Sequence, residues 1–213
     1  MSGTAKPGKR SRTAPPGSGA EPPTQHEKGS APMRVITGTA RGRKLKDLPG
    51  MDTRPTTDKV KESIFNIVQF DVEGRRVLDL FGGTGQLGIE ALSRGAGRCV
   101  FVDSSRQAAA VIRDNVALTG FSDRAQVVQG DAISFLGSCR EKFGLAFLDP
   151  PYAADLLEKA LFRIAEIDIM AENGIIVCES AAEKALPTLP APYEKGREYR
   201  YGKIKLTLYH RRA

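Results

Sequence analysis

The sequence predicts an α/β fold built on an open, largely parallel sheet. Short apolar runs typical of buried strands alternate with segments whose apolar residues recur at helical spacing. Four of the runs end in a glycine-rich turn or an aspartate, and that edge of the sheet is where open α/β folds bind ligands. At 213 residues the chain is long enough for one domain with a true core plus appendages.

The amino-acid composition indicates the cellular environment of the protein and the class of partner that it binds. The formal net charge is +7, from 32 Lys and Arg against 25 Asp and Glu, which favours a polyanionic partner. Cys99, Cys139 and Cys178 show no paired spacing, and His26 and His210 stand apart, so the sequence predicts no disulfide, no metal site and a reducing, cytoplasmic location. No apolar run approaches the ~20 residues of a membrane span. We expect a monomer that does not contact a membrane.

The chain is predicted to divide at residue 33. Residues 1–32 contain no Leu, Ile, Val or Phe and are rich in Pro, Gly, Ser and basic residues, a composition that predicts a disordered, mildly basic tail. Residues 33–213 form the ordered domain, in which 33–70 are expected to face the partner and 71–213 to form the core.

The ordered part is expected to begin with a small hairpin and a helix. Residues 34–38 and 43–45 read as two short strands joined through 39–42. A helix follows, capped by Thr57 and carrying Asp58 in its first turn. The hairpin holds five cations and no acid, a pattern that usually marks a solvated face but on so compact a turn favours phosphate contact. These cations are Arg34, Arg41, Arg43, Lys44 and Lys46.

The first core strand, 76–81, runs into the glycine turn 82–88, which opens a helix through Leu92. Glycines allow a tight turn and close approach of the backbone to a ligand at a helix N-terminus. The turn also satisfies G-x-G-x-x-G, which raises the possibility of a nicotinamide dehydrogenase. Asp79 opposes that reading, because a carboxylate at this strand end favours a cationic or amino-bearing ligand and repels a pyrophosphate.

The next two strands also end in acids. Strand 98–102 leads to Asp103, which can accept both hydroxyls of a ribose or can cap the following helix. Strand 125–129 leads to Asp131 and Ala132, whose carboxylate and backbone N–H suit the amino group and a ring nitrogen of adenine.

The fourth strand, 143–148, stops at Asp149-Pro150-Pro151-Tyr152. The prolines remove backbone donors and prevent a helix, so the carboxylate stands at the strand end beside an aromatic ring. Asp149 and the Pro150 carbonyl can accept both hydrogens of an exocyclic amine while Tyr152 stacks on the base. A merely Pro-stiffened turn is the alternative.

The remaining elements complete the sheet. A helix is predicted around residues 156–164, and a fifth strand, 174–178, ends at Glu179. Residues 197–209 alternate around Gly202 as a hairpin. Its inward residues are expected to be Ile204, Leu206 and Leu208, and its outward residues Lys203, Lys205 and Thr207.

Two long stretches resemble known methyltransferase motifs. Residues 79–96 (DLFGGTGQLGIEALSRGA) resemble the first motif of S-adenosylmethionine-dependent methyltransferases, and DPPY at 149–152 resembles the motif of those that methylate exocyclic amines. RVITGTARGRKL at 34–45 and RPTTDKVKESIFN at 54–66 are similar to bacterial 16S ribosomal RNA guanine-N2 methyltransferases of the RsmD type. The family more often has Ala-Gly-Ser-Gly where this chain has Gly-Gly-Thr-Gly.

The resemblance implies a Rossmann-like, doubly wound seven-stranded sheet, S-adenosylmethionine as cofactor, and a guanine N2 of 16S ribosomal RNA in an assembling small subunit as acceptor. Catalysis would fall to Asp149, Pro150, Pro151 and Tyr152. Cofactor binding would fall to Asp79, Phe81, Gly82, Gly83, Thr84, Gly85, Asp103, Ser104, Asp131 and Ala132. RNA binding would fall to Arg34, Arg41, Arg43, Lys44, Arg54 and Thr56. An adenine-N6 DNA methyltransferase and a non-catalytic RNA-binding assembly factor stay open as alternatives.

Overall fold

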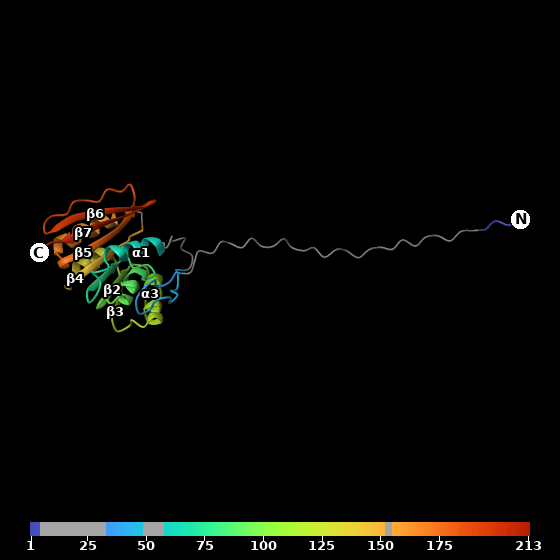
Figure 1. Ribbon diagram of the computed structural model, residues 1–213, viewed down its shortest axis with the longest axis horizontal. Coiled ribbons are helices and arrows are strands. Elements are labelled where there is room, and N and C mark those ends of the chain that lie inside the picture. Colours follow the sequence, from blue (N-terminus) through green and yellow to red (C-terminus); the bar gives the residue numbers. More distant parts are fainter. Residues whose placement is uncertain (5–32, 49–57, 152–154) are drawn as a thin grey trace. The chain divides into compact units, whose positions relative to one another are not determined.

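The computed structural model describes residues 1–4, 33–48, 58–151 and 155–213 (Figure 1). Apart from its first four residues, the predicted tail lies outside the described residues. Three predicted site residues do so as well: Arg54, Thr56 and Tyr152. Residues 32–213 form one compact unit. No helix in the described part is long and apolar enough to cross a membrane.

Helices and strands alternate along the core, as the apolar pattern predicts. The helices are α1 (Asp58–Ile67), α2 (Gln86–Ser93), α3 (Arg106–Thr119), α4 (Ala132–Ser138) and α5 (Leu156–Ile167). The strands are β1 (Arg76–Leu80), β2 (Arg98–Asp103), β3 (Ala125–Gln129), β4 (Phe143–Leu148), β5 (Met170–Ala181), β6 (Tyr193–Tyr201) and β7 (Ile204–Arg211).

The seven strands form a single sheet in the order β3-β2-β1-β4-β5-β7-β6. The first five are parallel to their neighbours, and β7 runs antiparallel between β5 and β6. The strand order reverses between β1 and β4, which is the point where doubly wound sheets place their ligand. The predicted Rossmann-like, doubly wound seven-stranded fold is therefore confirmed.

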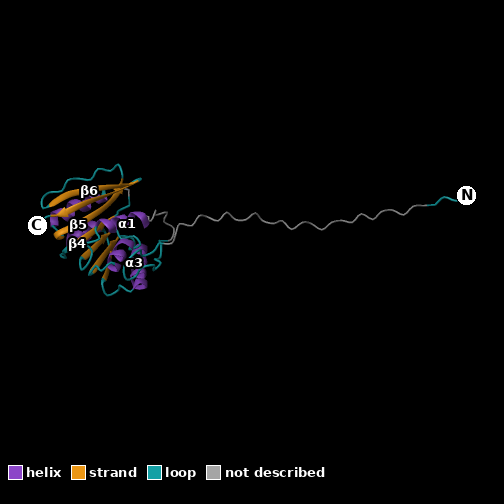
Figure 2. Ribbon diagram, in the orientation of Figure 1, coloured by secondary structure: helices purple, strands orange, loops and turns teal. Residues whose placement is uncertain are grey.

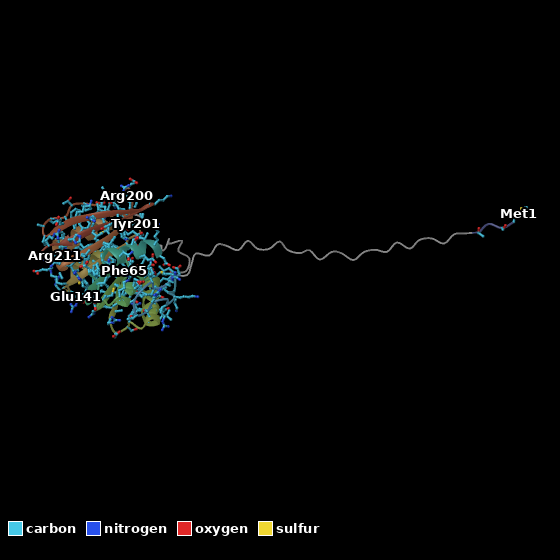
Figure 3. All side chains as sticks on the ribbon, viewed as in Figure 1. Met1, Phe65, Glu141, Arg200, Tyr201 and Arg211 are labelled. Atoms are coloured by element: carbon cyan, nitrogen blue, oxygen red, sulfur yellow. The ribbon has the colours of Figure 1, made fainter. Side chains whose placement is uncertain are left out.

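Helices cover both faces of the sheet (Figure 2). Along β1, Val77 packs in the core with α1, α2 and α3, while Leu78 packs with α4 and α5. This alternation is the period of two expected of a strand buried on both faces. Phe65 of α1, labelled in Figure 3, belongs to the first of these layers, and its ring contacts Phe147 of β4 with 5.5 Å between ring centroids.

Glycine is required where α2 packs on the sheet. A Cβ on Gly88 would lie 2.2 Å from Cε1 of Phe101 and 2.6 Å from Sγ of Cys99, so any larger residue would push the helix away from β2. The Gly88 backbone also donates a hydrogen bond to Asp79 at 2.9 Å, which fixes α2 over the end of β1.

The N-terminal arm, defined here as residues 33–48, is a more irregular hairpin than the sequence predicts. In place of two strands it has one antiparallel bridge, between Arg34 and Lys44. Flanking backbone bonds join Val35 to Arg43 and Leu45 to Met33.

Side chains of α2 hold the arm in place. Glu90 accepts hydrogen bonds from the backbone of Ile36 (2.7 Å) and Thr37 (2.9 Å), and the Ser93 hydroxyl accepts from Ala40 (3.0 Å). Gly38 has a φ of +86°, and a Cβ there would lie 1.8 Å from the Ser93 carbonyl oxygen. The arm is thus bonded to the helix that follows the glycine turn.

The prediction that Lys205 and Thr207 face outward is wrong. Their exposed fractions are 3% and 0%, and both lie near Glu198 of β6. The segment between β5 and β6 covers this face, where Leu186 and Leu189 are buried. The prediction of alternation along β7 is correct, but other parts of the chain cover both faces of this strand, so its polar residues are buried as well as its apolar ones.

Candidate active site

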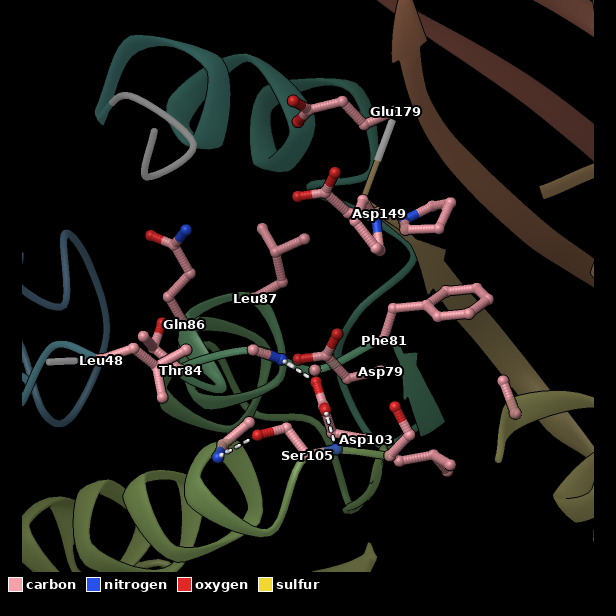
Figure 4. A pocket seen from close by; sticks show the side chains of 18 of the residues that line it. Leu48, Asp79, Phe81, Thr84, Gln86, Leu87, Asp103, Ser105, Asp149 and Glu179 are labelled. Atoms are coloured by element: carbon pink, nitrogen blue, oxygen red, sulfur yellow. Dashed lines mark hydrogen bonds between the residues drawn. The ribbon is translucent and has the colours of Figure 1, made fainter. Parts of the chain in front are cut away.

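A cavity of about 520 Å³ lies at the carboxyl ends of the parallel strands (Figure 4). Its walls come from the turns that follow β1, β2, β3 and β4, together with the end of the N-terminal arm and the end of β5. The described residues that line it are Asp47, Leu48, Asp79, Phe81, Gly82, Gly83, Thr84, Gln86, Leu87, Val102, Asp103, Ser104, Ser105, Ala108, Asp131, Ala132, Asp149, Pro150, Pro151, Leu156, Glu179 and Ile204.

Sequence-predicted residues are brought together here, with Gly85 as an exception. Every other residue predicted for the cofactor lines the cavity, as do Asp149, Pro150 and Pro151. Gly85 instead begins α2 in a left-handed conformation (φ +79°), where a Cβ would lie 3.2 Å from Ile112. It shapes the turn from beneath. The described cations of the predicted RNA site, in the arm, are exposed and do not line the cavity.

Asp103 ties two of the cavity walls together. One carboxylate oxygen accepts from the Gly83 backbone at 2.8 Å, and the other accepts from the Ser105 backbone at 2.8 Å. The cap of α3 is Ser105, whose hydroxyl accepts from Ala108. Asp103 is therefore not that cap, and its carboxylate has further lone pairs that can accept from the cavity.

Asp79 is buried beneath the glycine turn with an exposed fraction of 3%. Its pKa is raised to about 7, chiefly by burial and also by the neighbouring carboxylates of Asp149 and Asp103, against the lowering effect of the Gly88 backbone bond. Because the pKa of this carboxyl group lies near neutral pH, a cation in the cavity would strongly stabilise its ionised form.

Phe81 adopts a left-handed conformation (φ +71°), which is rare for a bulky residue. Its backbone and that of Gly82 both donate to the Val102 carbonyl at 2.9 Å, so the turn after β1 is bound to the end of β2. A strained backbone conformation persists only where the surrounding structure enforces it, and such conformations are common at ligand-binding sites.

At the end of β3, Asp131 caps α4 by accepting from the Ser134 backbone at 2.8 Å. That bond lowers the pKa of the Asp131 carboxyl, which is exposed and ionised. The capping role occupies one oxygen and leaves the carboxylate at the mouth of the cavity, next to buried Ala132.

Asp149 lies where β4 ends and faces the cavity (Figure 4). Pro150 is buried and Pro151 is exposed, so the turn is anchored by its first proline. The Asp149 carboxylate also contributes to the raised pKa of Asp79.

The lining is strongly acidic. It includes six carboxyl side chains and no Lys, Arg or His among the described residues. The acidic residues are Asp47, Asp79, Asp103, Asp131, Asp149 and Glu179. Such a cavity attracts a cation and repels a pyrophosphate, which argues against a dinucleotide. No group of His, Cys, Asp and Glu in the described ranges is placed to hold a metal ion.

A family model described as "Conserved hypothetical protein 95" matches residues 33–210. The chain belongs to this family.

Relatives and solved structures agree with this membership and with the resemblance seen in the sequence. The Bacillus subtilis (strain 168) protein YlbH, described as a candidate rRNA methyltransferase, is 42% identical over 85% of this chain and its own full length. Ribosomal RNA small subunit methyltransferase D of Escherichia coli (strain K12) is 37% identical over 87% of this chain and 93% of its own. The solved Escherichia coli structure of yhhF, a candidate methyltransferase, superposes with a TM-score of 0.76 at 36% identity, covering 86% of this chain and 99% of that one.

Several residues that line the cavity are not among those predicted from the sequence. Asp47 and Leu48 at the end of the arm, Gln86 in the glycine turn, and Glu179 at the end of β5 all line the cavity. Glu179 had a visible signal, because it is an acid at a predicted strand end like the other four. The arm residues had none, because their contacts join segments far apart in sequence.

Buried Asn115 of α3 makes one such contact. Its side-chain oxygen accepts from the Lys46 backbone at 2.7 Å, and its nitrogen donates to the carbonyls of Lys46 (3.0 Å) and Thr84 (2.9 Å). The end of the arm and the glycine turn are therefore held by the same amide.

Proposed function

We propose that this protein transfers a methyl group from S-adenosylmethionine to the N2 amine of a specific guanine in 16S ribosomal RNA of the small subunit, acting as a cytoplasmic monomer. The observation that carries the proposal is the acidic cavity at the switch point of the sheet. The names of the relatives support the RNA of the small subunit as the substrate class.

The charges and hydrogen-bonding groups of the cavity fit this cofactor. Its sulfonium and ammonium groups are cationic, and Asp79 lies buried beneath the turn where a cation offsets the carboxylates. Asp103 has lone pairs for the ribose hydroxyls, and Asp131 with Ala132 suits an adenine edge. The surroundings of Gly83 are open, because a Cβ there would meet nothing within 4 Å, so the turn leaves room for the ligand.

Catalysis rests on how the target amine is held. When bound, S-adenosylmethionine supplies a methyl group whose carbon–sulfur bond breaks, leaving the electron pair on sulfur, while the guanine N2 lone pair forms the new bond to carbon. Asp149 and the Pro150 carbonyl accept the amine hydrogens, which favours a pyramidal, nucleophilic nitrogen and stabilises its developing positive charge. Asp149 then takes the proton that N2 sheds. Positioning provides the rest.

The proposal is tested by methyl transfer to small subunits purified from cells that lack the endogenous enzyme. We expect one N2-methylguanosine per subunit, mapped to a single nucleotide by mass spectrometry. Methylation of adenine N6 instead would favour a DNA-type amine enzyme. If calorimetry detects no binding of S-adenosylmethionine, the chain would be a non-catalytic RNA-binding factor.

Cofactor affinity is expected to depend on pH through Asp79. The carboxylate form attracts the ammonium group, and with a pKa of about 7 most of the carboxylate is lost as pH falls below that value. Between about pH 7.5 and about pH 5.5 the affinity measured by calorimetry should fall roughly 25-fold, because the ionised fraction of a group with a pKa of about 7 falls by that factor over this range.

Asp79→Asn provides the control for this titration. The amide oxygen can still accept from Gly88, but the group no longer titrates in this range. Its affinity should be lower than wild type at pH 7.5 and nearly independent of pH. A wild-type affinity that does not change with pH would remove Asp79 from the cofactor site.

The N-terminal arm is proposed to contact RNA phosphates. Arg41, Arg43 and Lys44 are exposed, and no ion pair within the described ranges engages them. The double variant Arg43→Ala/Lys44→Ala should bind small subunits several-fold more weakly and lower the slope of log affinity against log salt by about one to two, because each phosphate contact releases counterions.

A matched control lies at the amino-terminal ends of the parallel strands, away from the cavity. Arg76 and Arg98 begin β1 and β2, far along the strands from the cavity, and Arg76→Ala/Arg98→Ala removes the same charge. Equal losses for both double variants would show that net charge, and not the arm, governs binding.

A further inference from the structure

The wall of the cavity next to Asp149 carries a second carboxylate, Glu179 of β5. Its exposed fraction is 6%, and it lines the same cavity. Burying a carboxyl group at a ligand site is costly, so a buried acid there usually meets a donor or a positive charge when the ligand is bound.

Strand register places the two acids side by side. In the parallel pair of β4 and β5, Leu148 is the partner of Cys178, so Glu179 is the next residue on β5 and Asp149 is the first residue after β4. Side chains alternate along a strand, and both positions follow residues that face α4 and α5, so both acids project to the opposite face. Figure 4 shows both carboxyl groups pointing into the cavity.

Neighbouring strands are about 4.8 Å apart, so these two carboxyl groups can accept hydrogen bonds from adjacent atoms on one edge of a planar base. Guanine presents the N1–H and the N2 amine side by side, and both are donors. Adenine presents its amine beside N1, which is an acceptor. A carboxylate facing that nitrogen would be repelled and left without a donor, an arrangement that strongly disfavours the wrong base.

We propose that Glu179 is a specificity-determining residue that accepts the N1–H of the target guanine while Asp149 holds its N2 amine. The inference rests on the proposed function and extends it, because it explains why this member of the amine-methylating enzymes selects guanine over adenine. Glu179 reads the base, and Asp149 acts on the reacting atom.

The test compares guanine with 2-aminopurine at the mapped target position of reconstituted small subunits. 2-Aminopurine keeps the N2 amine but has an acceptor at N1. Wild-type protein should prefer guanine by at least about 10²-fold in kcat/KM, since rejection by an unpaired polar group is strong. Glu179→Gln should lose at least about tenfold on guanine, and its guanine/2-aminopurine ratio should fall at least tenfold, because an amide can donate to N1.

The ratio of ratios cancels the intrinsic reactivity of the two amines and any general loss of folding. Glu183→Gln, an exposed acid beyond the end of β5, serves as the matched control and should leave both rates unchanged. If Glu179→Gln lowers both rates by one common factor, Glu179 is only structural. If wild type does not discriminate at N1, the inference fails while N2 methylation of guanine still stands.

Discussion

Asp149→Ala is expected to lower the turnover number for methyl transfer by roughly 10²-fold to 10³-fold, the range for losing one preorganised electrostatic partner of a reacting group. Without the carboxylate, the amine keeps only the Pro150 carbonyl as acceptor. Its lone pair stays delocalised into the ring, and the charge that develops on N2 is not offset. The measurement is single-turnover transfer to small subunits at saturating cofactor.

The affinity for cofactor distinguishes loss of chemistry from a general loss of structure. Removing Asp149 leaves Asp79, Asp103 and the glycine turn in place, so Asp149→Ala should still bind S-adenosylmethionine. Asp155→Ala, an exposed acid a few residues along the chain, is the matched control and should retain full turnover. Near-normal turnover of Asp149→Ala, with folding intact, would exclude this residue from the chemistry.

Site residues can be predicted from the sequence where a pattern of neighbouring residues is enough to place them. Asp79, Asp103, Asp131 and Asp149 each follow an apolar run, so a short window of sequence is enough to place them at a strand end. Parallel strands bring those ends to one edge, which makes a cluster predictable without knowing any long-range contact. Their chemical roles stay predictions.

Tertiary contacts set the limit of that reasoning. Lys205 reads as an outward residue from alternation alone, yet it is buried because a connecting segment covers β7. Glu90 reads as an ordinary helical glutamate. Its partners in the arm lie more than fifty residues earlier in the sequence, with separations of 54 and 53, and no local pattern could have identified them.

The arm shows what the missed contacts do. The sequence predicts, within one domain, a basic hairpin that faces the partner and a separate catalytic core. In the structure, the end of the arm is a wall of the cavity, through Asp47 and Leu48, and the amide of Asn115 bonds both the arm and the glycine turn. If the arm binds RNA and the turn binds cofactor, as proposed, the order of one site should therefore affect the other.

Glu90→Ala is expected to cost the fold about 3 kcal/mol or more. Glu90 is fully buried, and its carboxylate accepts from the backbones of Ile36 and Thr37 and from Arg94 (2.9 Å). Removing it leaves two amides and a guanidinium without their acceptor, the most destabilising way to break a buried charged network. Urea denaturation would measure the loss, and hydrogen exchange at the Ile36 and Thr37 amides would locate it.

The functional consequence follows from the position of the arm. Once released from α2, the arm no longer holds Leu48 against the cavity, so Glu90→Ala should weaken binding of both cofactor and small subunits, whereas Arg43→Ala/Lys44→Ala weakens only the second. Glu62→Ala, an exposed glutamate on α1, controls for loss of a helical acid and should change neither binding nor stability appreciably. Unaltered amide exchange in the arm of Glu90→Ala would show that other contacts hold it and that cofactor and RNA sites are independent.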